Sequence, residues 1–362
     1  MQARPARRRH RDRHATICPE PERVNMLKLA TRAALVRLAI GLAAAAILLL
    51  IVGAFMIWMP GRSHKGALPP ITDDQAALAD RLRADVDHLA HEIGPRHVDR
   101  PEALNAAADW VAHRFEQIGY MVERETYQHD GRELVNIVAE LPGRAAPARI
   151  VVVGAHYDTV PGSPGANDNG SGVAALLALA EHFHDNPPPA TLRFVSFVNE
   201  ELSRDDPEQI GSYVHARRSR ERGDDIVAMM SMDGLGYYDD AENSQRYPTR
   251  GIGLIYPTRA DFIAFITRTG DAGLVRQAVG AFRQAAAFPS QGAALPSSVG
   301  GVGWSDHWSF WQHGYGAFLV TDTLPFRYDA YHTLADLPGA LDYDRLARVV
   351  EGLQAVVNSL AQ

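Results

Sequence analysis

Short apolar runs alternate along this chain with segments in which apolar residues recur at helical spacing. The helical segments are Asp73–Ile93, Pro101–Ile118 and, at the C-terminus, Asp342–Leu360. The apolar runs are rich in β-branched residues, and several are too uniformly apolar for a sheet with one solvated face. They are Val135–Leu141, Arg149–Gly154, Thr191–Val198, Ile226–Met232 and Ala317–Thr321. The alternation predicts an α/β fold in which a mostly parallel central sheet is covered by helices on both faces.

One stretch, from about residue 238 to residue 303, departs from this alternation. It contains four prolines, a segment of helical character around Ala260–Gly270 and a run of small residues from Ser290 to Gly303. We interpret it as an insertion that crosses the sheet edge and forms a wall of the active site. The insertion belongs to a single predicted domain of residues 73–362, which is long enough to bury a large core.

A separate apolar segment precedes this domain. Leu38–Met59 comprises 22 residues without a charged side chain, and about 20 helical residues cross the hydrocarbon core of a bilayer. Trp58 at its end suits the headgroup region, and Pro60 is expected to stop the helix. A cleaved signal peptide is the alternative, but its apolar region is shorter, about 7 to 15 residues. The segment therefore predicts an uncleaved transmembrane helix, followed by a Pro/Gly-rich tether at residues 60–72.

The distribution of charge predicts the orientation of this helix. Residues 1–37 carry ten basic and three acidic side chains, whereas only Arg62 and Lys65 follow closely after the span. Under the positive-inside rule, residues 1–37 form a basic cytoplasmic tail and the domain is periplasmic or extracellular. A start at Met26 would leave this prediction unchanged.

The formal net charge of −7 leaves −14 on the residues after the basic tail. This acidic body argues against nucleic acid as a partner, since phosphate binding requires a basic surface. The single cysteine, Cys18, lies in the tail, so the domain has neither a disulfide nor a thiolate for catalysis.

Acidic and histidine side chains follow several predicted strands directly, where the ligands of parallel sheets gather. Each has an ordinary alternative taken alone: a helix-capping acid, a solvated Glu-Glu turn or an unremarkable loop histidine. Glu200 and Glu201, however, are adjacent at the end of a buried strand, where their mutual repulsion favours a compensating cation. Two imidazoles and three carboxylates together fit two zinc ions; the five are His156, Asp168, Glu201, Asp233 and His332.

The motifs around these residues resemble those of the bacterial di-zinc aminopeptidases, a family of metallopeptidases. This family belongs to the zinc exopeptidases, with relatives among glutamate carboxypeptidase, the transferrin receptor and glutaminyl cyclase. The resemblance covers roughly residues 75–360, and its motifs are GAHYDTVPGSPGANDNGSG, NEE, SMDGLGYY, SDHWSFW and YHTLAD.

The resemblance implies a role for each residue of the site. His156 and Asp233 would hold one zinc ion, Glu201 and His332 the other, and Asp168 would bridge them. Glu200 would be the general base, and Asp158 would support His156 from behind. The resemblance also implies a cis peptide bond between Asp168 and Asn169.

Other polar residues have two open interpretations. Tyr331 is a candidate donor to the oxyanion of the tetrahedral intermediate, with packing as the alternative. Asp306 and His307 are candidate wall residues of the site, with structural hydrogen bonding as the alternative. His182, His184, His215 and His313 are interpreted as surface or helix residues. The chain departs from the family pattern after Glu201, because residues 202–210 lengthen the loop before Gly211.

These observations predict a membrane-anchored zinc exopeptidase that removes N-terminal residues from peptides. One alternative is a single-zinc acyltransferase similar to glutaminyl cyclase, and the other is a receptor-like relative without activity. The number of zinc ions per chain would distinguish the two enzymes, because the peptidase is expected to bind two and the cyclase one. The presence of all five candidate ligands and the candidate base argues against the receptor.

Overall fold

The computed structural model describes residues 22–202, 204–249 and 251–362, and the chain divides into two units, residues 1–55 and 56–362. Helix α1 (Glu22–Ile57) makes up the described part of the first unit. Its segment Thr31–Ile57 is long and apolar enough to cross a membrane, and its side chains are exposed. Trp58 and Met59, which we predicted to lie within the span, follow the helix. Most of the predicted basic tail, with Cys18, lies outside the described residues.

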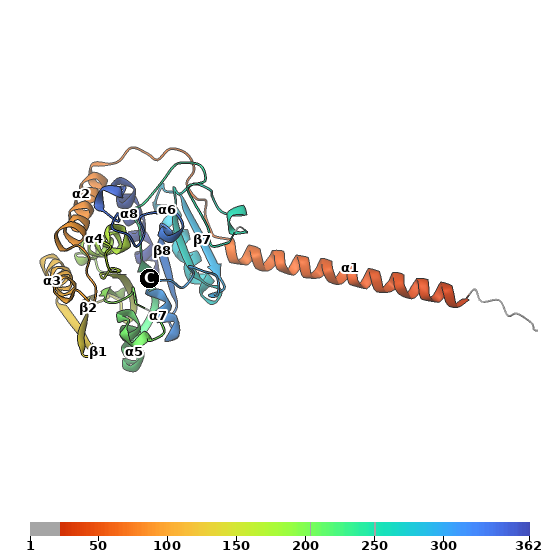
Figure 1. Cartoon of the computed structure of the whole chain (residues 1–362), viewed down its shortest axis with the longest axis horizontal. Helices are drawn as coiled ribbons and strands as arrows, with labels where there is room; N and C mark the ends of the chain where they lie inside the picture. Colours follow the sequence, from red (N-terminus) through yellow and green to blue (C-terminus); the bar gives the residue numbers. More distant parts are fainter. Residues whose placement is uncertain (1–21, 203, 250) are drawn as a thin grey trace, which may run out of the picture. The chain divides into compact units, whose positions relative to one another are not determined.

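The second unit is built around one mixed sheet of eight strands in the order β1-β2-β4-β3-β5-β8-β6-β7 (Figure 1). Four strand pairs are parallel, β3·β4, β3·β5, β5·β8 and β6·β7, and three are antiparallel. The strands are β1 (Val122–His129), β2 (Arg132–Leu141), β3 (Ala146–His156), β4 (Ala190–Phe197), β5 (Asp225–Met232), β6 (Ile263–Arg268), β7 (Ser290–Leu295) and β8 (Ala317–Thr321).

Helices cover both faces of this sheet, as predicted (Figure 1). The larger buried cluster lies under α2 (Asp73–Asp87), α3 (Pro101–Ile118), α4 (Gly172–His184), α6 (Ala272–Ala285) and α8 (Tyr343–Leu360). The smaller cluster, on the other face, lies under α5 (Gly211–Arg222) and α7 (His307–Gln312).

Helix α2 shows how the sequence dictates such an element. Thr72 and Gln75 form a capping box at its start, and Leu78, Leu82 and Val86 recur at helical spacing and are buried.

The prediction of a helix around residues 260–270 is wrong. Residues 263–268 form β6, which lies between β8 and β7, and helix α6 begins only at Ala272. The first residues of the small-residue run form β7. A short apolar run bounded by Pro and Gly cannot be assigned by periodicity alone, and here Ile263, Phe265 and Thr267 are buried β formers. The predicted domain boundaries, including the insertion, stay predictions.

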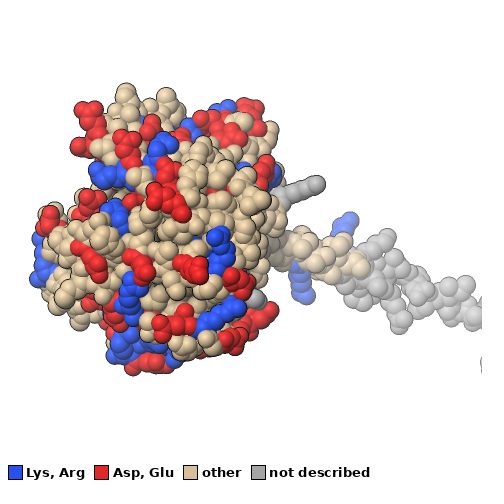
Figure 2. Space-filling model, turned by 60° about the vertical axis from the view of Figure 1, so that its left-hand side comes forward, with Lys and Arg blue, Asp and Glu red and all other residues tan. Residues whose placement is uncertain are grey.

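Charged side chains of both signs are interspersed over the face of the second unit that Figure 2 shows. Many of the acidic and basic groups pair, as Arg124 does with Asp109 and Arg259 with Glu242. Exposed pairs of this kind contribute little to stability, so the fold rests on its two apolar clusters.

Candidate metal centre

The predicted site residues meet at one edge of the sheet. Because β3, β4, β5 and β8 run parallel, their carboxyl ends share this edge. His156 is the last residue of β3, Glu200 and Glu201 follow β4, and Asp233 follows β5. Asp168 lies in the turn η2 (Ala166–Ser171), which connects β3 to α4, and His332 lies in the loop after β8.

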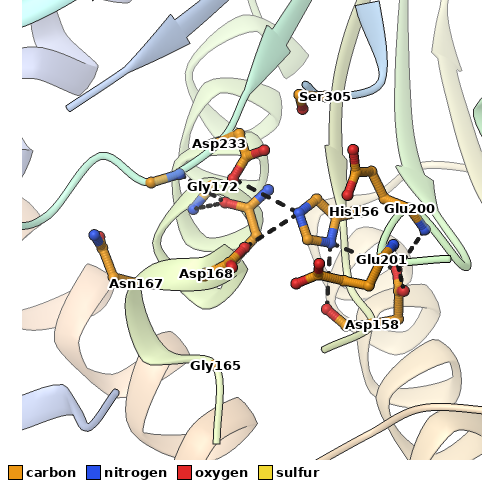
Figure 3. Close-up of polar contacts among 12 residues, drawn as sticks. His156, Asp158, Gly165, Asn167, Asp168, Gly172, Glu200, Glu201, Asp233 and Ser305 are labelled. Atoms are coloured by element: carbon orange, nitrogen blue, oxygen red, sulfur yellow. Dashed lines mark hydrogen bonds and ion pairs between the residues drawn. The ribbon is translucent and has the colours of Figure 1, made fainter. Parts of the chain in front are cut away.

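Five of these side chains form two groups that share Asp168. In the first group, His156 Nε2 lies 3.4 Å from Asp168 Oδ1 and 3.6 Å from Asp233 Oδ1. In the second, His332 Nε2 lies 3.1 Å from both Asp168 Oδ2 and Glu201 Oε2. Figure 3 shows Asp168 and Asp233 pointing toward the ring of His156. The candidate ligand atoms of each group lie within 4.8 Å of one another.

These distances fit zinc. Two ligand atoms that bind one Zn²⁺ tetrahedrally, each at about 2.0 to 2.1 Å, are separated by about 3.3 Å. The burial of the donors agrees with a metal as well. His156 Nε2, Glu201 Oε1 and Asp233 Oδ1 are buried and have no hydrogen-bond partner among the described residues. Buried polar atoms are normally satisfied, and a metal ion in each of the two groups would compensate for the missing hydrogen bonds.

Burial and mutual repulsion dominate the electrostatics of the carboxyl groups. Burial and the charge of Asp168 raise the pKa of Glu201 to about 8, although His332 opposes this shift. Burial also raises the pKa of Glu200 well above its usual range. Asp168 is the exception: burial alone would raise its pKa, but the neighbouring imidazoles of His156 and His332 outweigh burial and lower it.

The imidazoles respond to the same carboxylates. Burial would lower the pKa of His156, but the nearby carboxylates of Asp158, Asp168 and Asp233 raise it well above its usual range. The pKa of His332 is raised to about 10, because Asp168 and Glu201 outweigh the effect of burial. Both rings therefore bind protons strongly when carboxylates are their only partners, and a metal ion must compete with those protons.

Asp158 connects His156 to the Glu-Glu pair (Figure 3). Its Oδ1 atom lies 3.5 Å from His156 Nδ1, and its backbone oxygen lies 3.2 Å from the same nitrogen. The backbone N–H of Glu200 donates to Oδ1 at 3.2 Å, and that of Glu201 donates to Oδ2 at 3.3 Å. One buried carboxylate thus orients the imidazole and the loop that carries both glutamates.

Three residues without a predicted role position the turn that carries Asp168. The carboxylate of Asp336 accepts hydrogen bonds from the backbone N–H groups of Asn167 at 2.8 Å and Asp168 at 3.1 Å. Asn167 Nδ2 donates to Asp322 at 2.9 Å. Asp336 ends the YHTLAD motif and Asp322 follows β8, so both were visible as polar residues beside the site. The Asp168–Asn169 peptide bond is cis, as the resemblance implied.

Arg96 is a further residue that sequence reasoning missed. It is fully buried, and its guanidinium donates to the backbone oxygens of Leu89, Gly94, Tyr157, Pro164 and Gly165. These bonds hold the chain between β3 and η2. Gly165 has φ +65°, and a Cβ there would lie 2.3 Å from Thr159 Cγ2, so this bend requires glycine.

The lengthened loop after Glu201 is closed at its base and reaches the opposite wall of the site. Asn136 accepts from Val198 N–H at 3.2 Å and donates to the Gly211 oxygen at 2.9 Å, joining the two ends of the loop. Within the loop, Arg204 Nη2 lies 3.6 Å from Glu200 Oε1. The same guanidinium donates to the Gly303 oxygen and lies 4.8 Å from the ring centroid of Trp308.

The residues with two interpretations take different positions. Tyr331 stacks on His332 with ring centroids 3.7 Å apart. Burial, together with the charges of Asp168 and Glu201, raises its pKa, so the phenol keeps its proton. Asp306 is buried, and burial raises its pKa to about 7. His307 lies 2.8 Å from the Val302 oxygen, which favours the structural interpretation for this residue.

The histidines interpreted as surface or helix residues lie on or at the end of helices. His182 and His184 are in the last turn of α4, and His313 follows α7. His215 lies on α5 but is buried, with Nδ1 2.9 Å from Glu125 Oε2.

An apolar cavity of about 100 Å³ adjoins the centre. Asp233 and Tyr331 form its wall on the side of the metal ligands. Strands β6 and β7 and the segments after β5 and β8 supply the rest, including Tyr247, Ile252, Tyr256, Phe262 and Phe326. The cavity therefore lies where a substrate side chain could enter beside the reacting bond.

The fold and the arrangement of these side chains define a metallopeptidase. The sequence model of peptidase family M28 matches residues 136–357, which is more than half of the chain. The chain therefore belongs to peptidase family M28, and the resemblance inferred from the motifs is confirmed.

Individual proteins are also similar to this chain. The chain is 33% identical over 285 residues to the uncharacterized protein YfbL of Escherichia coli (strain K12), covering 76% of this chain and 87% of that protein. The solved structure of BSAP, a zinc aminopeptidase from Bacillus subtilis, matches with a TM-score of 0.59 and 16% identity over 81% of this chain and 95% of BSAP. A glutaminyl cyclase from Bacteroides thetaiotaomicron matches with a TM-score of 0.56 and 17% identity, covering 81% and 99% of the two chains. At these identities, the two structures show the fold alone.

Proposed function

We propose that this chain is a membrane-anchored zinc aminopeptidase with two metal ions. The observation that carries the proposal is the pair of ligand groups that share Asp168. His156 and Asp233 would hold one ion and His332 and Glu201 the other, with Asp168 between them. When bound, the two zinc ions would lower the pKa of a water molecule and polarise the scissile carbonyl group.

The remaining roles belong to side chains beside the ligands. Glu200 takes the proton of the attacking water and passes it to the leaving amine, because it is buried beside the centre and adjacent to ligand Glu201. Asp158 keeps His156 oriented through Nδ1. The phenol of Tyr331, which keeps its proton, donates to the oxyanion of the tetrahedral intermediate.

The apolar cavity supports a preference for substrates with an apolar side chain at the N-terminal residue. Its lining is dominated by aromatic and aliphatic groups, whereas Asp233 and Tyr331 stand at its metal side. A peptide whose first side chain fills the cavity would have its first carbonyl group near the ligands. The carboxylates of the centre would attract the free ammonium group at the same end.

The proposed location follows from the charge pattern and the apolar helix. Thr31–Ile57 would cross the membrane, with the basic N-terminus in the cytoplasm and residues 58–362 in the periplasm or outside the cell. The substrates would then be peptides outside the cytoplasm.

The test uses the full-length protein in detergent, loaded with zinc, and a panel of aminoacyl-nitroanilides together with N-terminally blocked peptides. We expect hydrolysis of apolar aminoacyl substrates, no hydrolysis of blocked ones and loss of activity with a chelator. Activity that persists after complete metal removal would refute the proposal. Cyclisation of N-terminal glutamine with one zinc ion per chain would instead favour the cyclase, whose fold is also similar.

A further inference from the structure

The residues that follow helix α1 are packed against the edge of the catalytic unit. Met59 is 8% exposed and contacts β7: a Cβ at Gly292 would lie 2.7 Å from Met59 Sδ. Arg283 of α6 donates to the Pro60 oxygen at 3.1 Å, and Arg276 donates to the Trp58 oxygen at 3.3 Å. The first part of the predicted tether is therefore held on the α6–β7 edge.

An exposed apolar turn lies against the same strand. Tyr256 donates its hydroxyl proton to the Gly292 oxygen at 2.8 Å, so it contacts the glycine on which Met59 packs. Just before Tyr256, the turn η4 (Ile252–Leu254) continues into Ile255. Leu254 is 90% exposed and Ile255 is 59% exposed, and Trp58, which directly precedes Met59, is 61% exposed. Three large apolar side chains thus face solvent along one edge.

The length of the chain fixes the distance between this edge and a membrane that α1 crosses. Met59 lies two residues after Ile57, and two residues span at most about 7 Å. The headgroup layer on each side of a bilayer is about 5 to 8 Å thick. The β7 edge therefore lies within one headgroup layer of the end of the span. Arg62 and Lys65, both exposed, are close enough in sequence to meet anionic headgroups.

We propose that Trp58, Leu254 and Ile255 form a docking surface for the lipid bilayer that holds the protein's own helix. This inference rests on the proposed membrane anchoring. The turn that carries Leu254 also supplies Ile252 and Tyr256 to the apolar cavity. The docking surface therefore places one wall of the substrate cavity at the level of the lipid headgroups.

The test measures whether lipid contacts the turn in the intact protein. The zinc-loaded full-length chain, with Cys18→Ser, carries an environment-sensitive fluorophore on Leu254→Cys and is reconstituted into phosphatidylethanolamine–phosphatidylglycerol vesicles. The matched control carries the label on Met121→Cys. Met121 is 93% exposed and adjoins β1, at the opposite edge of the sheet, about 34 Å away across seven strand spacings. Ile255→Cys is a second probe position, in case a label at residue 254 disturbs the turn.

We expect brominated acyl chains in the vesicles to quench most of the fluorescence at residue 254 or 255, and to leave residue 121 unquenched. Quenching of 254 and 255 by aqueous iodide alone would overturn the docking surface. Shielding of both positions from iodide without quenching by brominated lipid would also overturn it, because protein would then cover the turn. Alkaline carbonate extraction of the same vesicles tests the anchor separately: release of the protein would refute anchoring and docking together, whereas retention with a water-exposed turn would refute docking alone.

Discussion

Each imidazole of the centre contacts the carboxylate of Asp168, and this residue therefore has more influence on the site than any other. His156 and His332 approach different oxygens of Asp168, at 3.4 Å and 3.1 Å. The carboxylate of Asp336 accepts hydrogen bonds from the backbone N–H groups of Asp168 and of the preceding residue, Asn167, and so fixes the backbone there. As the proposed bridging ligand, Asp168 would then bring two ions to a set distance without reorganisation on binding.

This arrangement predicts unequal effects of two substitutions on metal content. Asp168→Ala removes a ligand of both ions, so the variant should retain little zinc after dialysis. Asp233→Ala should lose one ion and keep the other, since Glu201 and His332 still flank Asp168. Atomic absorption gives zinc per chain, and circular dichroism verifies the fold. An Asp168→Ala protein that retains two ions would contradict the bridging role.

We predict that a substitution of Glu200 reduces catalysis and leaves metal binding intact. Glu200→Gln keeps the shape of the side chain but cannot take a proton, so kcat should fall by about 10² to 10⁴-fold. Zinc content should stay the same, because this residue is not a proposed ligand. Glu208→Gln is the matched control, an exposed glutamate in the same loop that pairs with Arg217 at 3.3 Å. Equal activity of the two variants would exclude Glu200 as the base.

At the scale of elements, the ends of β3, β4 and β5 present three of the proposed ligands, His156, Glu201 and Asp233, and a buried polar cluster aligns the loop after β4. Asn136 of β2 joins both ends of that loop and also donates to Glu125 of β1 at 2.8 Å. Glu125 contacts His215 of α5 at 2.9 Å. Three elements are thereby tied together beneath the Glu-Glu pair.

The pKa of Glu125 makes this cluster sensitive to acid. Burial would raise it, but His215 and Asn136 lower it from 4.5 to about 2. A depressed carboxyl pKa gives stability that is complete above the unfolded value and is lost as the pH falls from about 4.5 toward 2. We predict that Glu125→Gln destabilises the protein by about 1 to 3 kcal/mol at neutral pH. Near pH 3 the difference from wild type should shrink.

Denaturant unfolding of both proteins in chelator, at neutral pH and near pH 3, measures this difference without a contribution from metal. A difference that is unchanged by pH would mean that Glu125 is not ionised in the folded state. Gln128→Ala, which removes a solvent-facing polar side chain from the same strand, controls for general effects on β1.

The elements also show where sequence patterns stop being sufficient. The five predicted strands are present because long apolar runs require burial on both faces. β1, with its mixed pattern VERETYQH, has no such run, and only its pairing with β2 makes it a strand. β6 was predicted as a helix because six residues are too few for periodicity to separate the two structures.

For the whole molecule, several carboxylates gather in one buried site and hold protons there. The affinity of the site for a metal ion is therefore expected to depend on pH. His332, with a pKa raised to about 10, holds a proton at neutral pH when no metal is bound. Zinc must displace that proton, which His332 holds between the carboxylates of Asp168 and Glu201.

We therefore predict that the apparent affinity for zinc increases by at least about tenfold per unit between about pH 6 and pH 8, since each displaced proton contributes one such factor. Competition with a chromophoric chelator at several pH values measures the affinity, and proton release in weak buffer counts the protons. Affinity that is independent of pH would contradict this. Saturating zinc should also raise Tm, by a few degrees at about 100 times Kd.

The sequence by itself determined the fold class, the apolar helix and the identities of the metal-ligand candidates, because burial of apolar runs and the chemistry of donor groups are local properties. It also revealed Asp336 and Asp322 as polar residues, but not what they hold. Only the tertiary structure decided that Asp168 contacts both histidines, that Arg96 fixes the loop before it and that Met59 packs on β7. These facts depend on contacts between segments far apart in the chain, and such contacts exist only after the sheet has assembled.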